Sequence, residues 1–151
     1  MRQYRTALVT GASSGIGRSL AVGLARSGTL VVLAARRQAL LEEVAAEILR
    51  AGGRAVVAPL DVADTEATVA HLRELDAQLE GLDLVVANAG VGVGGPTGGP
   101  TYAWEAVRGA LHTNLCGAAA TLTAVLPQMV ARGRGHLLAI SRSEERRVGK
   151  E

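Results

Sequence analysis

The chain has 151 residues with 16 basic and 14 acidic side chains, a formal net charge of +2 and one cysteine, Cys116. This length fits one domain with a single core and is too short for two. The nearly balanced charge predicts no nucleic-acid partner. A lone cysteine excludes an internal disulfide. The sequence has no signal-peptide pattern and no unbroken run of ~20 apolar residues. We therefore expect a cytoplasmic protein without a membrane partner.

Short apolar runs alternate along the chain with segments in which apolar residues recur every three or four positions, as in amphipathic helices. The predicted strands are residues 6–10, 30–35, 54–58, 82–87 and 136–141. The predicted helices are residues 15–27, 38–51, 64–79 and 102–131. Such alternation is typical of an α/β fold with a parallel sheet between two helix layers. Right-handed crossovers then give a Rossmann-type doubly wound sheet with strand order 3-2-1-4-5.

A glycine-rich segment joins the first predicted strand to the first predicted helix: residues 10–17 read Thr-Gly-Ala-Ser-Ser-Gly-Ile-Gly. A helix N-terminus presents unpaired backbone N–H groups and a partial positive charge, and glycines let a pyrophosphate approach the backbone. The segment therefore predicts a dinucleotide phosphate site, whereas an ordinary glycine-rich turn is the alternative. The candidate cofactor-binding residues here are Gly11, Ser13, Ser14, Gly15, Ile16 and Gly17.

The second predicted strand ends in Ala35 and is followed by Arg36 and Arg37. In the general Rossmann pattern an acidic residue at this place accepts hydrogen bonds from the adenosine ribose hydroxyls. An acid would repel a 2′-phosphate, whereas an arginine offers it a charged fork. The sequence therefore favours NADP over NAD as cofactor, with a solvated helix start as the alternative explanation of the two arginines.

Three further motifs follow in order: Asp61-Val62, Asn88-Ala89-Gly90 and Asn114-Leu115-Cys116-Gly117. Together with the glycine segment, they resemble the motifs of the classical short-chain dehydrogenase/reductase family, although Ala87 replaces the first Asn of that family's Asn-Asn-Ala-Gly. The resemblance implies that Asp61 and Val62 hold the adenine. It implies that Asn88, Ala89 and Gly90 steady the sheet and line the cofactor ribose. Asn114 would complete the catalytic tetrad by distorting its helix and holding a water in the proton relay.

The same resemblance implies an NADP-dependent oxidoreductase that transfers hydride between the nicotinamide and a small-molecule alcohol or carbonyl substrate. It also implies a homo-oligomeric full-length enzyme. In the family a catalytic Ser and a Tyr-x-x-x-Lys follow the fifth strand, but the tyrosines here are Tyr4 and Tyr102, and neither begins such a motif. We therefore expect the 151-residue chain to be inactive. A non-catalytic dinucleotide-binding module is the alternative, while an extended-type sugar-nucleotide epimerase usually has a Gly-x-x-Gly-x-x-Gly loop that this chain lacks.

Residues 142–151 read Arg-Ser-Glu-Glu-Arg-Arg-Val-Gly-Lys-Glu, an abruptly charged end after an apolar strand. All ten agree with the in-frame translation of a common sequencing-library adapter. We therefore expect residues 1–141 to form an incomplete NADP-binding domain and residues 142–151 to be an artefactual tail. His71, His112 and His136 form no metal-ligand spacing, so these histidines and Cys116 are interpreted as structural or surface residues and no metal is expected.

Overall fold

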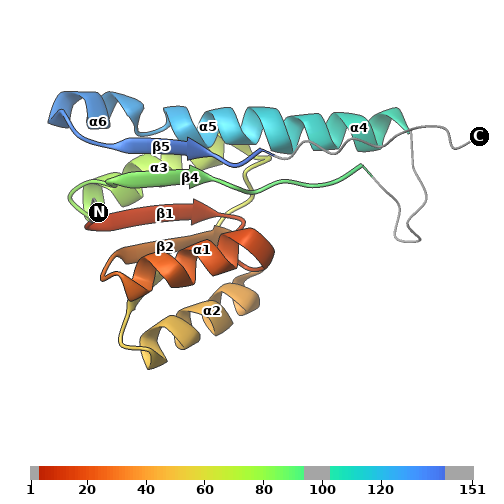
Figure 1. Cartoon of the computed structure of the whole chain (residues 1–151). Helices are drawn as coiled ribbons and strands as arrows, with labels where there is room; N and C mark the ends of the chain where they lie inside the picture. Colours follow the sequence, from red (N-terminus) through yellow and green to blue (C-terminus); the bar gives the residue numbers. More distant parts are fainter. Residues whose placement is uncertain (1–3, 94–102, 142–151) are drawn as a thin grey trace, which may run out of the picture.

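The computed structural model describes residues 4–93 and 103–141. Its single parallel sheet has the order β3-β2-β1-β4-β5, which confirms the doubly wound topology expected from the sequence (Figure 1). The strands are β1 (Thr6–Thr10), β2 (Leu30–Ala35), β3 (Arg54–Pro59), β4 (Leu84–Ala87) and β5 (His136–Ala139). The helices before β4 are α1 (Gly15–Arg26), α2 (Gln38–Arg50) and α3 (Thr65–Gln78).

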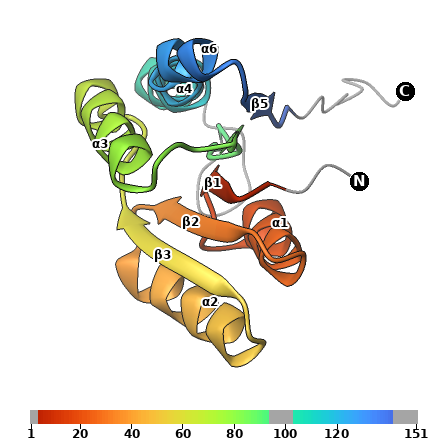
Figure 2. The ribbon, with the colours of Figure 1, turned by 90° about the vertical axis from the view of Figure 1, so that its left-hand side faces the viewer.

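Successive side chains of the central strands enter different cores, as the two-residue period of a strand requires. Ala7 and Val9 of β1 pack in the core beneath α1 and α2, and Leu8 packs in the core on the opposite face. Figure 2 shows this second face covered by α3 and by the helices that follow β4. Both faces of the central strands are thus buried, which explains why β2 and β4 are apolar throughout and β1 is apolar between its two terminal threonines.

The predicted helix over residues 102–131 is divided into four parts within the described residues. They are α4 (Trp104–Leu111), the π-helix η1 (His112–Gly117), α5 (Ala118–Thr123) and α6 (Leu126–Arg132). Pro127 lies in the first turn of α6, where a missing N–H costs no intrahelical hydrogen bond. A π-helical turn inside an α-helix is rare and often marks a functional position, and this one contains Asn114.

Among residues 4–93 and 103–141, one helical stretch, Trp104–Arg132, is long and apolar enough to cross a membrane by its length and composition alone. This is weak evidence for a membrane span, because a helix in the core of a water-soluble protein passes the same test. The absence of a membrane partner stays a prediction.

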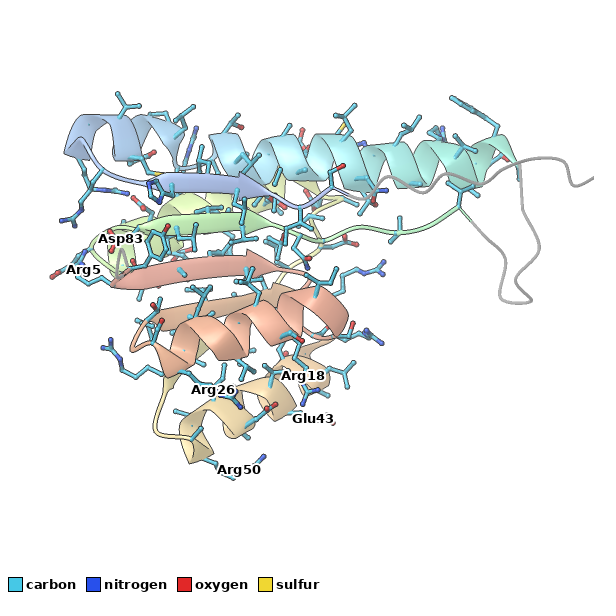
Figure 3. The ribbon with its side chains drawn as sticks, viewed as in Figure 1. Arg5, Arg18, Arg26, Glu43, Arg50 and Asp83 are labelled. Carbon is cyan, nitrogen blue, oxygen red and sulfur yellow. The ribbon has the colours of Figure 1, made fainter. Side chains whose placement is uncertain are left out.

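Charged side chains link the elements at the edge where the strands begin. Asp76 of α3 is 4% exposed and accepts hydrogen bonds from both terminal nitrogens of Arg132, at 2.7 and 3.0 Å, and from the Leu82 N–H at 2.7 Å. Since the Leu82 N–H is bonded to Asp76 and not to a neighbouring strand, Leu82 lies outside β4, which begins at Leu84 and not at the predicted residue 82. Figure 3 shows Arg5 and Asp83 at the same edge, where the Arg5 N–H donates to the Asp83 carboxylate at 2.9 Å.

Candidate cofactor-binding site

The glycine segment forms a tight turn between β1 and α1 at the carboxyl edge of the sheet. Gly11 and Gly15 have φ angles of +68° and +57°, in the left-handed region that favours glycine. The first hydrogen bond of the helix runs from the Arg18 N–H to the Ser14 carbonyl, so the N–H groups of the first turn precede the intrahelical ladder. The Ser14 side chain does not cap them. These donors can therefore receive an anion.

Two glycines of the segment are required by their contacts with the end of β4. A Cβ on Gly17 would collide with the Gly11 carbonyl oxygen and with Asn88 Nδ2. A Cβ on Gly11 would lie 2.9 Å from both the Ala89 Cα and Asn88 Nδ2. By contrast, a Cβ on Gly15 would meet nothing within 4 Å. Gly15 therefore faces open space, as an approach route for a ligand requires.

Asn88 connects the end of β4 to the glycine turn. Its Nδ2 donates to the Thr10 carbonyl oxygen at 2.9 Å, and its backbone N–H donates to Thr10 Oγ1 at 3.0 Å. Thr10 Oγ1 also accepts from the Ala89 N–H at 3.1 Å and donates to the Val86 carbonyl at 3.3 Å. The sequence motifs did not single out Thr10 as a site residue, because the three hydrogen bonds of its hydroxyl are visible only in the tertiary structure.

The end of β2 lies between the glycine turn and the loop after β3. The Ala12 N–H donates to the Ala34 carbonyl at 3.2 Å, and the Leu60 N–H donates to the Ala35 carbonyl at 3.0 Å. Arg36 and Arg37 follow directly, and both are exposed. Within residues 4–93 and 103–141, neither arginine side chain forms an ion pair or hydrogen bond. Both guanidinium groups are therefore available to a bound anion.

Arg18, another basic residue near the glycine turn, is already paired. Its Nη2 lies 2.7 Å from Glu47 Oε2 on α2, and Figure 3 shows its side chain between α1 and α2. Arg18 therefore differs from Arg36 and Arg37, whose guanidinium groups have no partner among the described residues. The ligand charge at this edge would therefore be met by the α1 N-terminus together with Arg36 and Arg37.

The loop after β3 is held in a fixed turn. The Asp61 carboxylate is exposed and accepts from the Ala63 N–H at 3.0 Å. Asp64 caps α3 by accepting from the Ala67 N–H at 3.0 Å. Val62 is 6% exposed and packs in the core under α3. Of the pair predicted to hold the adenine, Asp61 thus faces solvent while Val62 anchors the loop.

Asn114 joins η1 to the segment after β4. Its Oδ1 accepts from the Val91 N–H at 2.8 Å, and its Nδ2 donates to the Val91 carbonyl at 2.9 Å. A Cβ on Gly90 would lie 3.2 Å from Asn114 Oδ1, so the chain passes the asparagine closely at that point. Each amide atom keeps one more hydrogen-bonding position. The distorted helix expected at Asn114 is confirmed by the π-helical turn.

The sequence-predicted site residues before β4 and directly after it lie on loops or at helix starts at the carboxyl edge of the sheet, the usual ligand edge of an open α/β fold. Asn114 lies within the helical stretch after β4 and reaches this edge through its bonds to Val91. Among the described residues, no group of three or more His, Cys, Asp or Glu side chains could hold a metal ion. Residues 142–151 lie outside the described part, so their expected artefactual origin stays a prediction. The arrangement at this edge can bind a dianionic phosphate group and can position a ligand along the carboxyl ends of β1, β2, β3 and β4.

Comparisons with known proteins agree with this geometry. The family model for short chain dehydrogenase matches residues 5–148. An uncharacterized oxidoreductase of Myxococcus xanthus is 56% identical over 138 residues, which cover 91% of this chain and 54% of that protein. A fatty acyl-CoA reductase of Acinetobacter baylyi is 34% identical over 91% of this chain and 46% of its own length. The chain thus spans about half the length of these relatives.

Among solved structures, a metagenomic short-chain oxidoreductase in complex with NADP superimposes with a TM-score of 0.84. It is 37% identical, and the match covers 93% of this chain and 63% of that one. The family model spans nearly the whole chain, and the glycine turn, the sheet order and the asparagine-containing helix occur in the order that the family resemblance implied. The chain therefore belongs to the short-chain dehydrogenase family of oxidoreductases.

Proposed function

We propose that this chain is the cofactor-binding half of an NADP-dependent oxidoreductase that transfers hydride between the nicotinamide and a small-molecule alcohol or carbonyl substrate. One observation supports NADP over NAD above all others. At the end of β2, beside the glycine turn, Ala35 stands where an acid would accept the ribose hydroxyls, and two exposed, unpaired arginines follow it. The NADP-bound relative with the same fold adds support from outside the chain.

Each candidate residue has a distinct task in this proposal. The α1 N-terminus binds the pyrophosphate through the backbone N–H groups around Gly15, where a side chain is absent and space is open. Arg36 binds the 2′-phosphate with Arg37 beside it, because a guanidinium can donate two parallel hydrogen bonds to a phosphate. Asp61 accepts from the exocyclic amine of the adenine. When bound, the nicotinamide ring supplies or accepts the hydride.

Replacement of Arg36 tests the cofactor assignment in the full-length enzyme, in which this segment is followed by the second half that its relatives have. Arg36→Ala is expected to weaken NADP binding by about 1.5–3 kcal/mol, the value of a hydrogen bond to a charged group, which is about 10- to 150-fold in Kd. NAD binding should change little. Titration of both cofactors, followed by nicotinamide fluorescence in the reduced forms, measures both effects.

Arg50→Ala is the matched control, because Arg50 is exposed like Arg36 but is the last residue of α2, whereas Arg36 precedes the first turn of that helix (Figure 3). It should leave both affinities unchanged. Equal losses of NADP and NAD affinity in Arg36→Ala, or tighter NAD than NADP binding by the parent enzyme, would contradict the assignment.

Asn114 is proposed to serve the proton relay and not the cofactor site. Its amide holds the segment after β4 and keeps spare hydrogen-bonding positions for a water. Asn114→Ala in the full-length enzyme should therefore lower kcat by about 10²-fold, the lower end of the contribution of a proton-transfer group, while the Kd of NADPH stays nearly constant. Steady-state kinetics and cofactor titration measure the two quantities. A parallel fall of affinity and turnover would instead assign Asn114 to the support of the fold.

The remaining parts of the proposal concern the whole enzyme. We propose that it works in the cytoplasm as a homo-oligomer. The apolar side chains of Trp104, Leu111 and Leu115 support the oligomer, since they are 62%, 52% and 66% exposed along one helical stretch. Sedimentation velocity of the full-length enzyme tests this state.

A further inference from the structure

The π-helix η1 contacts two loops at the carboxyl edge at once. On one side Asn114 bonds both backbone groups of Val91, in the segment after β4. On the other side η1 lies against the loop after β3: His112 Nε2 is 2.8 Å from the Ala63 carbonyl oxygen, and a Cβ on Gly117 would be 2.7 Å from the Val62 carbonyl oxygen. The first and last residues of η1 therefore both meet the loop that contains Asp61.

The contact of His112 has a defined direction. A carbonyl oxygen can only accept, so Nε2 must carry the proton and donate to Ala63. The backbone N–H of Ala63 in turn donates to the Asp61 carboxylate at 3.0 Å. Ala63 thus accepts a hydrogen bond from His112 through its carbonyl oxygen and donates one to Asp61 through its N–H group. The position of the Asp61 carboxylate depends on the orientation of Ala63, which His112 restrains.

Outside η1, the loop is held by β2 and α3, because the Leu60 N–H donates to the Ala35 carbonyl at 3.0 Å and Thr68 Oγ1 donates to the Asp61 carbonyl at 3.4 Å. Local bonds around Asp64 add to these contacts. The Asp64 N–H donates to the Asp61 carbonyl at 3.0 Å, and Asp64 caps α3. These local bonds hold the turn itself, but they join residues at most three positions apart. His112 is 49 residues away from Ala63 in sequence. Together with the close approach of Gly117, its hydrogen bond ties the loop to the helix that bears Asn114.

We propose that His112 is a positioning residue for the adenine end of the cofactor, acting through Ala63 on the Asp61 carboxylate. This inference rests on the proposed function, in which Asp61 accepts from the adenine amine. It goes beyond the interpretation from the sequence, in which His112 is a structural or surface residue. His112 touches neither cofactor nor substrate in this arrangement, so its removal affects affinity for the adenine half and spares the chemical step.

The test measures binding of 2′,5′-ADP, which contains the adenine half of NADP, and of nicotinamide mononucleotide by calorimetry on the full-length enzyme. His112→Ala is expected to weaken 2′,5′-ADP about five- to tenfold, the effect of one lost net hydrogen bond. Affinity for nicotinamide mononucleotide should not change. In steady-state assays the KM of NADPH should rise by a similar factor while kcat at saturating NADPH stays at the parent value.

Two further variants separate positioning from general support of the fold. His112→Gln keeps an N–H donor on a side chain of comparable reach and should recover most of the 2′,5′-ADP affinity. Arg108→Ala removes an exposed charge one turn earlier, on α4, and should behave like the parent.

The outcomes distinguish this inference from the proposed function. If the parent does not bind 2′,5′-ADP, the proposed function fails and the role of His112 fails with it. If the parent binds and His112→Ala binds equally well, only the role of His112 is overturned. A fall of kcat equal to the rise of KM, or a Gln variant as weak as the Ala variant, would also overturn it.

Discussion

The 151-residue chain, expressed as it stands, is expected to reduce carbonyl compounds with NADPH at least about 10²- to 10⁴-fold more slowly than the full-length enzyme. This is the usual contribution of a positioned proton donor, and no tyrosine of the chain belongs to a Tyr-x-x-x-Lys motif. Tyr4 lies at the amino edge, where its hydroxyl is 2.6 Å from His136 Nδ1, far from the candidate site. End-point assays of carbonyl reduction, run for hours with the chain and with the full-length enzyme, measure the ratio of the two rates.

A comparable rate for the two proteins would contradict the catalytic part of this prediction. Binding of NADPH without turnover, by the full-length enzyme as well as by the chain, would instead favour the non-catalytic dinucleotide-binding module. The full-length enzyme with its catalytic Tyr replaced by Phe is the matched control. It should bind NADPH like the parent and share the low rate of the 151-residue chain.

The same chain is expected to aggregate or to remain partly ordered in solution. Within the described residues β5 is an edge of the sheet, and its Leu137 and Leu138 are 37% and 45% exposed. Unpaired strand edges and exposed apolar patches favour association. The apolar helical stretch that begins at Trp104 adds a second such surface. Sedimentation velocity measures the outcome, and a cooperatively unfolding monomer would contradict the expectation.

Gly17→Ala is expected to destabilise the full-length enzyme by about 3 kcal/mol, the upper end of the range for overpacking a closely packed site. The added Cβ would collide with the Gly11 carbonyl oxygen and with the Asn88 amide, and the amide is held by Thr10. Neither neighbour is the free end of a flexible side chain. Relief requires α1 to move away from β1, so NADP affinity should fall as well. Urea denaturation and cofactor titration measure the two losses.

Gly23→Ala on the same helix is the matched control. Its Cβ would meet nothing within 4 Å, and the residue is exposed. This variant should stabilise the enzyme by about 0.4–1 kcal/mol, because alanine has fewer unfolded conformations to lose. Equal stability of the two variants would show that contacts with Asn88 and Gly11 do not limit the residue at position 17.

The sequence by itself determined the elements of the sheet and their order. Apolar strands alternate with amphipathic helices, and such short-range patterns depend on residues only a few positions apart. Right-handed crossovers then leave few topologies, of which the observed order β3-β2-β1-β4-β5 is the one predicted. The glycine turn was also predictable, because Gly11 and Gly15 occur at the strand-to-helix junction where positive φ angles are needed.

Other features depended on residues far apart in the chain. Asn88 and Thr10 meet across 78 positions, and this contact explains why Gly17 can have no side chain. The spacing of apolar residues did not predict the π-helical turn, because the one extra residue that such a turn adds hardly changes the apolar pattern over six residues. Its anchors, Asn114 to Val91 across 23 positions and His112 to Ala63 across 49, exist only once α3 and the helices after β4 cover the same face of the sheet. Tertiary packing alone decided these contacts, because each one pairs groups that the local sequence leaves free to bond with water.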